Sequence, residues 1–386
     1  MAKLGRFFAD PGGSFFLFGP RGTGKSTWLG QNLAGGLHVD LLAPEVHRSL
    51  LARPERLREL LAANPGTEVV LIDEVQRVPS LLDVVHQQLE ARAGDLRFVM
   101  TGSSSRKLKH AGVNLLAGRA TLRSLHPFMA AELDQAFELE RALEYGLLPL
   151  VSQAVDPRAT RDAYLALYVR EEVQAEGLVR DLGAFSRFLE AVSMAHGSVL
   201  NISAVARDCS VSRKTVEGYL SIVEDLLLSF RVPVFTRSAK RRTVVHPKFY
   251  FFDVGVYRAA RPQGPLDSAD EISGAALEGL VAQHLRAWVE YSNAGASLYY
   301  WRTPSGSEVD FVVYGGEVFY AVEVKNTRRP RSRDTAALRT FKRDYPEARV
   351  ALVYRGEERS MVGGVLCLPV DEFLRGLRPG HQILDG

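Results

Sequence analysis

A glycine-rich segment near the amino terminus has the residue types and spacing that bind a nucleoside triphosphate. Residues 19–26 read GPRGTGKS and satisfy the pattern G-x-x-x-x-G-K-[ST] between an apolar stretch and a helical one. The glycines let backbone N–H groups curl around phosphate, while Lys25 would reach the β and γ oxygens and Ser26 would bind Mg²⁺. We therefore predict a site for ATP and Mg²⁺ formed by Gly19, Pro20, Arg21, Gly22, Thr23, Gly24, Lys25, Ser26 and Thr27.

A second segment places two carboxylates at the end of a strand. Residues 68–79, EVVLIDEVQRVP, contain an apolar run that predicts a buried parallel strand, with Asp73 and Glu74 at its carboxyl end. Asp73 would hold the Mg²⁺ shell, and Glu74 would orient and deprotonate the attacking water. The pair indicates hydrolysis more than nucleotide binding alone; the alternative role for such residues is a helix N-cap.

Polar residues after a third strand, and one arginine, complete the predicted ATPase site. Segment 96–100 predicts a strand whose end carries Thr101 and Ser103 beside the expected γ-phosphate, where either could sense hydrolysis. Arg119, in LLAGRATLRSLHPF, has two interpretations. It is either an arginine finger supplied to a neighbouring subunit, which would make the active form an oligomer, or an ordinary surface arginine.

Acidic residues also gather in a predicted β-hairpin over residues 306–325. A turn at 315–316 would set Asp310 opposite Ala321 and Glu308 opposite Glu323, with Asp310 diagonal to Glu323. The predicted core face carries Val309, Phe311, Val313, Val318, Tyr320, Val322 and Val324. The other face carries Glu308, Asp310, Glu323 and Lys325, and such crowding of like charges indicates a use for them.

Metal-dependent phosphodiester chemistry is one such use. Residues 272–291 predict an amphipathic helix that carries Glu278. Glu278, Asp310 and Glu323 would hold Mg²⁺, which polarises phosphate, and Lys325 would orient water or stabilise the pentavalent charge. The plain alternative is a solvated hairpin face, and a degenerate site that only binds DNA lies between the two.

The middle of the chain predicts a helix–turn–helix. In NISAVARDCSVSRKTVEGYLSIVEDLLL, two helical stretches flank a short turn at 209–212. The predicted inward face of the second helix carries Val216, Leu220, Val223 and Leu227. Arg213, Lys214 and Glu217 point elsewhere.

The strands that follow predict a winged helix with a basic tip, TRSAKRRT. Between Asp225 and Asp253 there are six Lys or Arg residues and no acid, a local charge suited to phosphate contacts. Nonspecific backbone contact is favoured, because Glu217 would oppose a phosphate. Winged helices also serve as protein contacts, and a charged tip can simply be solvated. The predicted DNA-binding residues are Arg213, Lys214, Arg237, Lys240, Arg241 and Arg242.

Composition sets the remaining limits. A length of 386 residues predicts two or three domains, and a formal charge of +3 is too weak to identify a partner. The cysteines, Cys209 and Cys367, match no metal spacing and predict reduced thiols. No apolar run approaches the length of a membrane span and the start lacks a signal peptide, so we expect a cytoplasmic protein without a membrane partner.

Taken together, these motifs resemble those of prokaryotic AAA-type ATPases that carry a carboxyl-terminal domain of unknown function with a restriction-endonuclease-like PD-(D/E)xK core. The resemblance covers nearly the full length and rests on GPRGTGKST, LIDEVQRVP, TGSSS, LAGRA, LHPFMAAE, SVSRKTVEGYL, KFYFFDVG, EVDFVV and AVEVK. It implies an oligomeric P-loop ATPase with a nuclease-like tail. Lys25, Ser26, Asp73, Glu74 and Arg119 would serve the motor, and Glu278, Asp310, Glu323 and Lys325 the tail. One departure is Gly279, where the pattern would have asparagine.

The predicted fold is α/β: an AAA+-like P-loop parallel sheet with helices, then a winged helix and a restriction-endonuclease-like α/β domain. We predict a P-loop core at 1–126, a helical lid at 127–185, a winged helix-turn-helix at 186–260 and a nuclease-like domain at 261–386. The leading functional hypothesis is an oligomeric ATP-hydrolysing motor, a ring such as a hexamer, that grips DNA and cuts or clamps it. The alternative is a nucleotide-controlled protein-interaction switch with non-catalytic docking modules.

Overall fold

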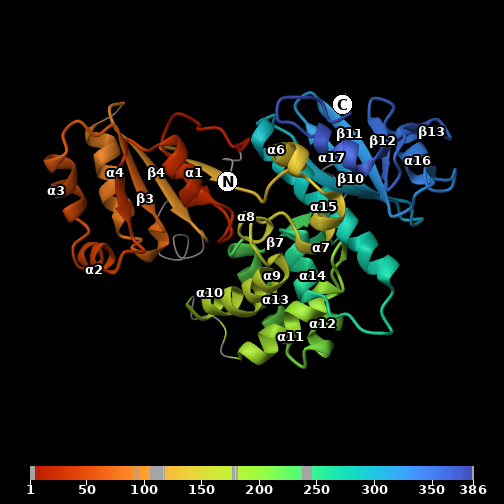
Figure 1. Ribbon diagram of the computed structural model, residues 1–386, viewed down its shortest axis with the longest axis horizontal. Coiled ribbons are helices and arrows are strands. Elements are labelled where there is room, and N and C mark those ends of the chain that lie inside the picture. Colours follow the sequence, from red (N-terminus) through yellow and green to blue (C-terminus); the bar gives the residue numbers. More distant parts are fainter. Residues whose placement is uncertain are drawn as a thin grey trace. The chain divides into compact units, whose positions relative to one another are not determined.

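The computed structural model describes residues 5–92, 94–104, 116, 118–175, 179, 181–236 and 246–384 (Figure 1). The chain divides into two compact units, which are described separately. One unit comprises Phe8–His126 with Val223–Leu227, and the other comprises Met1–Phe7, Pro127–Ile222 and Leu228–Gly386. No helix among the described residues is both long enough and apolar enough to cross a membrane.

The first unit is an α/β fold around a five-stranded sheet, consistent with a P-loop fold. Its strands are β1 (Phe15–Phe18), β2 (Leu37–Asp40), β3 (Val69–Asp73), β4 (Arg97–Gly102) and β5 (Thr121–Ser124). They lie in the order β2-β3-β4-β1-β5, and all pairs are parallel. The carboxyl ends of β1, β3 and β4 therefore meet at one edge, where such sheets place ligands.

Helices and a short turn connect these strands. They are α1 (Lys25–Asn32), α2 (Pro44–Ala52), α3 (Arg56–Ala63), the 3₁₀ turn η1 (Val75–Arg77) and α4 (Leu81–Ala91). The central strands read as continuous apolar runs because both faces are covered. Phe16, Ile72, Phe98 and Met100 are fully buried in one core cluster with Leu57, Leu61, Leu81 and Val85 from the helices.

The second unit begins with short helices. They are α6 (Ala130–Leu133), α7 (Leu139–Tyr145), α8 (Pro149–Ser152), α9 (Pro157–Ala163), the π-helix η3 (Tyr164–Val169), α10 (Arg170–Ala175) and α11 (Leu182–Ser193). The predicted winged helix-turn-helix segment starts at residue 186, inside helix α11. This helix begins four residues earlier because Asp181 is its N-cap and accepts a hydrogen bond from the Ala184 backbone N–H at 2.9 Å.

The middle of this unit combines two helices with a small antiparallel sheet. Helices α12 (Ile202–Asp208) and α13 (Arg213–Asp225) flank a short turn, and Asn201 caps the first of them through the Ala204 N–H at 3.1 Å. Strands β6 (Ser198–Val199), β7 (Ser229–Val232) and β8 (Lys248–Phe251) form a sheet in the order β6-β8-β7. These elements occupy the stretch for which a winged helix is predicted.

The carboxyl-terminal part is a mixed six-stranded sheet with helices. Its strands are β9 (Ser297–Arg302), β10 (Glu308–Gly315), β11 (Val318–Lys325), β12 (Arg349–Tyr354), β13 (Ser360–Val362) and β14 (Val365–Pro369), in the order β13-β14-β12-β11-β10-β9. The helices are α14 (Val254–Ala260), α15 (Ala269–Ser292), α16 (Ala336–Asp344) and α17 (Val370–Gly376). Helix α15 covers the amphipathic helix predicted over 272–291, and its apolar stripe is buried: this stripe consists of Leu277, Leu280, Val281, His284, Leu285 and Trp288.

The predicted hairpin forms, but its register differs from the prediction. Gly315 pairs with Val318, so the turn lies at 316–317 and every pairing slips by two residues. Gly316 remains a turn residue with a positive φ of 57°, but neither glycine has room for a side chain: a Cβ at Gly315 would lie 2.5 Å from the Gly295 carbonyl oxygen, and one at Gly316 2.3 Å from the Ala294 oxygen. Both glycines therefore also allow close packing against another backbone segment. Continuing the register places Asp310 directly opposite Glu323, not diagonal to it.

The prediction of a single core face for the hairpin was also wrong. Val312 and Ala321, which share the face of Asp310, are fully buried and pack with Leu338 and Phe341 of α16. Phe311, Val313 and Val322 on the other face are fully buried as well. The charged residues are therefore confined to one end of the strand pair, where other parts of the chain can form ion pairs and hydrogen bonds with them.

Candidate functional site

The glycine-rich loop has the conformation that the sequence predicts. Gly22 and Gly24 adopt positive φ angles of 83° and 91°, a backbone region that other residues rarely occupy. Lys25 is the first residue of α1, and its Nζ donates to the carbonyl oxygens of Gly19 at 2.6 Å and Pro20 at 3.3 Å. Gly19 has no room for a side chain, because a Cβ there would lie 2.7 Å from the Leu125 oxygen. The loop and lysine can therefore close around phosphate.

Three predicted site residues meet at the carboxyl edge of the sheet. The Ser26 hydroxyl donates to Asp73 Oδ2 at 2.7 Å, and the Thr101 hydroxyl donates to Asp73 Oδ1. The Glu74 backbone N–H in turn donates to the Thr101 oxygen at 3.1 Å. A hydroxyl and a carboxylate are oxygen donors of the kind Mg²⁺ prefers, so these residues fit the predicted metal.

Glu74 is held by a residue that the sequence interpretation missed. Glu74 has a left-handed φ of 60° and starts the turn η1. Gln76 Nε2 donates to the Glu74 carboxylate and, at 3.1 Å, to the Ser103 hydroxyl. A Cβ at Gly102 would lie 2.6 Å from Gln76 Oε1. Gln76 therefore joins the predicted base to the predicted sensor, and its position two residues after Glu74 in LIDEVQRVP was the available signal.

The remaining loop residues and Arg119 are placed as follows. The Thr23 hydroxyl is buried and donates to the Pro20 oxygen at 2.8 Å, while Arg21 is exposed. Arg119 is half-exposed, with 41% of its side-chain surface accessible, and Nη2 lies 2.8 Å from Glu90 Oε1 in α4 of the same unit. Its role as a finger toward another subunit stays a prediction.

The carboxylates of the tail gather around a lysine that was not predicted. Lys248, on β8, is buried with 3% of its side chain exposed. Its Nζ lies 3.1 Å from Glu278 Oε1, 2.7 Å from Glu308 Oε1 and 3.2 Å from Asp310 Oδ1. Tyr250, also on β8, donates its hydroxyl to Glu278 Oε1 at 2.6 Å. One strand of the small sheet thus supplies the cation and a donor to the carboxylates of α15 and β10.

The other predicted tail residues lie at the same end of the hairpin. The second oxygen of Asp310, Oδ2, accepts from the Val324 backbone N–H at 2.9 Å. Glu323 pairs with Lys325 through Oε1, while Oε2 accepts from the Asp310 N–H at 3.4 Å. We call these seven residues, Lys248, Tyr250, Glu278, Glu308, Asp310, Glu323 and Lys325, the carboxylate–lysine centre.

Burial and mutual repulsion shape the charge states in this centre. Burial raises the pKa of Glu278 and of Glu323, and the neighbouring Asp310 carboxylate raises both further. Burial alone would lower the pKa of Lys248, but the three carboxylates around it outweigh burial and raise that pKa. Lys248 therefore stays positively charged, and all three carboxylates interact with this one charge.

Close packing explains Gly279, which stands where the resemblance predicts asparagine. A Cβ at Gly279 would lie 2.1 Å from His196 Nε2, because the imidazole packs directly on the helix backbone. Gly197 is also constrained, though less severely, since a Cβ there would meet the Glu278 carboxyl group at 3.3 Å. His196 Nδ1 accepts from the Phe251 N–H at 3.2 Å, and burial lowers the pKa of His196 to about 3. A side chain at position 279 would collide with this neutral ring.

The predicted metal ligands do not form a metal cage. Within the part of the chain that the structure describes, no group of three or more His, Cys, Asp or Glu side chains is arranged to hold a metal ion. Glu278, Asp310 and Glu323 each engage a lysine, a tyrosine or a backbone N–H instead. As they stand, these residues do not fit a divalent ion.

The predicted DNA-binding residues fall into two groups. Arg213 and Lys214 lie at the start of α13 and are exposed, as is Glu217 one turn further on. Ser212 precedes them and accepts a hydrogen bond from the Thr215 N–H at 3.1 Å. The others, Arg237, Lys240, Arg241 and Arg242, lie outside the described residues.

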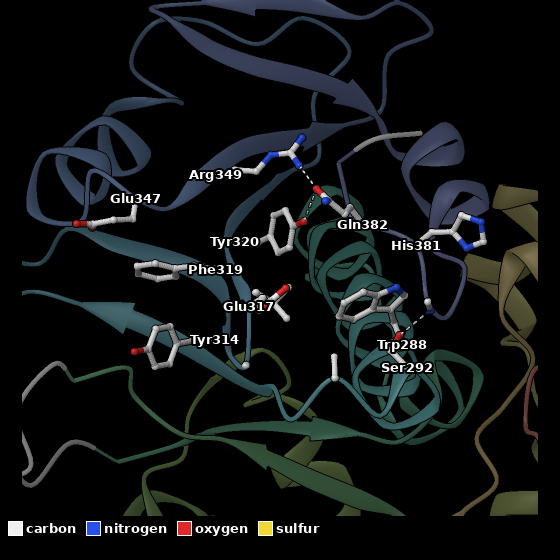
Figure 2. A pocket seen from close by; sticks show the side chains of 14 residues that line it. Trp288, Ser292, Tyr314, Glu317, Phe319, Tyr320, Glu347, Arg349, His381 and Gln382 are labelled. Carbon is white, nitrogen blue, oxygen red and sulfur yellow. Dashed lines mark hydrogen bonds between the residues drawn. The ribbon is translucent and has the colours of Figure 1, made fainter. Parts of the chain in front are cut away.

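A separate hollow with a volume of about 570 Å³ lies in the carboxyl-terminal part (Figure 2). Figure 2 shows Tyr320 and Arg349 directed at Gln382, whose Oε1 accepts from the tyrosine hydroxyl at 3.3 Å and from the arginine. Trp288 of α15 also lines it and donates to the Arg378 oxygen at 3.0 Å. None of the predicted site residues lines this hollow.

Comparison with known proteins supports the interpretation of the first unit. Residues 13–133 match an AAA domain model, which supports a P-loop AAA-type ATPase that hydrolyses nucleotide. Residues 136–267 and 273–373 match two domains of unknown function, DUF8612 and DUF4143. The chain is also similar to an uncharacterized protein of Mycobacterium tuberculosis, Rv2008c, and to one of Mycobacterium bovis, Mb2031c. Each is 28% identical over 371 residues, covering 93% of this chain and 80% of the relative.

Proposed function

We propose that this protein is a DNA-processing motor driven by ATP hydrolysis. The observation that carries the proposal is the joined network of Ser26, Asp73 and Thr101 beside a closed phosphate loop, together with an exposed basic start of α13. Such a motor needs both a site that hydrolyses ATP and a surface that binds DNA. Movement along branched or damaged DNA would be one use.

The residues of the first unit divide the work of hydrolysis. The loop N–H groups and Lys25 bind and orient the triphosphate, and Ser26 and Asp73 would hold Mg²⁺, which neutralises developing charge. Glu74 takes the proton of the attacking water, held in place by Gln76. Thr101 and Ser103, bonded to Asp73 and Gln76 respectively, can report loss of the γ-phosphate to the rest of the unit.

Oligomerisation is part of the proposal. Arg119 is half-exposed on the unit that carries the nucleotide site, where a neighbouring copy could receive it. An arginine supplied in trans stabilises charge on the transferring phosphoryl group. The active form would then be a homo-oligomeric ring, for which a hexamer is one arrangement.

DNA contact is proposed for α13 and the basic segment after β7. Arg213 and Lys214 are exposed in the first turn of α13, which follows a short turn. Helix N-termini and basic side chains both favour phosphate, whereas Glu217 on the same helix disfavours it. Contacts with the backbone, without base selection, agree best with this mixture. The tail, proposed to have a nuclease-like fold, would cut or clamp the bound strand.

Salt-dependent DNA binding tests this proposal. The double variant Arg213→Ala/Lys214→Ala should weaken binding uniformly across sequences and reduce the salt slope by about two. Glu217→Ala, on the same helix, is the matched control and should tighten binding or leave it unchanged. Fluorescence anisotropy with labelled single-stranded, duplex and forked DNA over a salt series measures both. Wild-type protein that binds none of these DNAs would contradict the proposal.

A second candidate is a nucleotide-controlled protein-interaction switch. It is favoured by the carboxylate–lysine centre, whose carboxylates and lysines pair with one another. Such a protein would bind ATP and oligomerise, yet its ATP turnover would not respond to DNA. Salt-sensitive DNA affinity that depends on Arg213 and Lys214 would argue against it.

A further inference from the structure

We propose that the ammonium group of Lys248 takes the place of a divalent metal ion in the tail. The carboxylate–lysine centre would then be a metal-free module, fastened by this lysine to the small sheet β6-β8-β7. The inference concerns the tail of the proposed motor and narrows its role to holding, not cutting. It does not require that DNA bind at all.

The first argument is geometric. Lys248 Nζ lies within 3.2 Å of carboxylate oxygens from Glu278, Glu308 and Asp310, which belong to one helix and one strand. An ammonium group has three N–H donors, so three carboxylates match its full capacity. The converging oxygens of Glu278 and Asp310 are those predicted to bind metal, and both are engaged by the amine.

The second argument concerns charge. A divalent ion needs oxygen ligands near 2.1–2.6 Å, so an ion shared by Glu278 and Asp310 would occupy the space of the amine. The positively charged ammonium group would also repel the ion, because a buried charge is only weakly screened by water. Lys248 cannot readily withdraw, because only 3% of its side chain is exposed and its Nζ lies over the Tyr300 ring, 5.5 Å from the ring centroid.

The third argument is that the lysine belongs to a rigid connection. Phe235, which follows β7, donates its N–H to the Tyr300 oxygen at 2.6 Å, and Tyr300 donates back to the Pro233 oxygen at 2.9 Å. The Phe235 side chain is buried in the same core cluster as Val312 and Leu352 of the tail sheet. The small sheet and the tail therefore pack together, and Lys248 is held in register with the carboxylates.

Manganese binding tests the inference. All proteins would carry Ser26→Ala and Asp73→Ala and be studied without nucleotide, so that the phosphate loop contributes no metal site. Binding of MnCl₂ would be followed by electron paramagnetic resonance of free Mn²⁺ and by thermal melting. In this background the unaltered tail should bind no Mn²⁺, and Lys248→Arg, which keeps the charge, should behave alike. Lys248→Ala frees three carboxylates, and the affinity of this variant for Mn²⁺ should rise at least tenfold, with a matching rise in its melting temperature when Mn²⁺ is added.

Two outcomes would overturn the inference. One is stoichiometric Mn²⁺ binding with Lys248 in place that is lost on Glu323→Ala. This measurement does not need the lysine variant, so it decides the question even where Lys248→Ala fails to fold. The other is a folded Lys248→Ala variant that gains no affinity for Mn²⁺. These experiments contain no DNA, so both results can be interpreted even if the protein does not bind DNA.

Discussion

Glu74 is the residue on which hydrolysis should depend most sharply. It follows the strand end at Asp73, and its carboxylate is oriented by Gln76. Glu74→Gln keeps the shape but removes the base, so kcat for ATP hydrolysis should fall by about 10²-fold or more while nucleotide affinity is retained. Steady-state turnover and binding of a fluorescent ATP analogue would measure the two effects.

The matched control for this substitution is Glu68→Gln. Glu68 is exposed and immediately precedes β3, at the opposite end of that strand from Glu74. Its change should leave turnover within about twofold. Equal loss in both variants, or unchanged turnover in Glu74→Gln, would mean that Glu74 is not the base.

His284 should make the second unit sensitive to acid. Its Nε2 accepts from the Ala130 N–H at 2.9 Å and its Nδ1 lies 2.7 Å from the Leu280 oxygen, so both nitrogens are engaged in the neutral ring. Burial lowers the pKa of His284 from 6.5 to about 4. Between these values the unfolded state binds more protons, so stability falls as pH drops below 6.5.

At pH 5 this histidine should cost about 2 kcal/mol of stability relative to pH 7. Hydrogen exchange of the α15 amides across this pH range would measure the local opening free energy. His284→Gln, which does not titrate, should remove most of the slope in α15 while the amides of α4 in the first unit change little. An identical slope in wild type and variant would refute the assignment.

At the scale of elements, two glycines of α15 should respond oppositely to the same change. A Cβ at Gly279 would lie 2.1 Å from His196 Nε2, whereas at Gly274 the nearest atom, Asn326 Cβ, is 3.7 Å away. Gly279→Ala should therefore destabilise by about 1–3 kcal/mol through overpacking. Gly274→Ala should stabilise by up to about 1 kcal/mol, as expected for alanine in a helix.

Urea unfolding followed by circular dichroism would compare the two alanine variants directly. Both changes add one methyl group to the same helix, so propensity contributes alike to each. Destabilisation by Gly279→Ala alone would confirm the contact with His196. Equal effects of either sign would show that α15 and the 196–197 turn are not packed as described.

Sequence patterns predicted where helices, strands and loops lie along the chain better than they predicted which of them pair or pack together. The loop at 19–26 and the carboxylates after β3 could be placed because spacing along the chain decides them. The hairpin register could not, since two adjacent glycines indicate a tight turn equally well when they serve to pack against residues 294–295. The fold of each strand is local, but its pairing depends on what else is nearby.

Lys248 shows the same limit at the candidate site. It comes from a strand far along the chain from the hairpin, and no periodic pattern links the two. A signal was nevertheless present, because KFYFF is a lysine attached to an apolar run, and all four residues of β8 are buried. A buried lysine requires carboxylate partners, which the acidic hairpin supplies.

At the scale of the whole molecule, the chain combines two units with different chemistry. Phe8–His126 carries the residues assigned to the nucleotide site, and the other unit carries Arg213, Lys214 and the carboxylate–lysine centre. Neither unit alone explains the proposed function, because the proposed DNA contact and the nucleotide site lie in separate parts of the chain. A motor requires that nucleotide binding in the first unit change how the second unit binds DNA.

The most direct test of this account is the rate of ATP hydrolysis with and without DNA. Single-stranded, duplex or forked DNA should raise the wild-type rate severalfold, and the increase should be lost in Arg213→Ala/Lys214→Ala, whose rate without DNA stays near that of wild type. Lys25→Ala should abolish turnover under all conditions. A wild-type rate that is measurable but unchanged by every DNA would contradict the account and favour the protein-interaction switch.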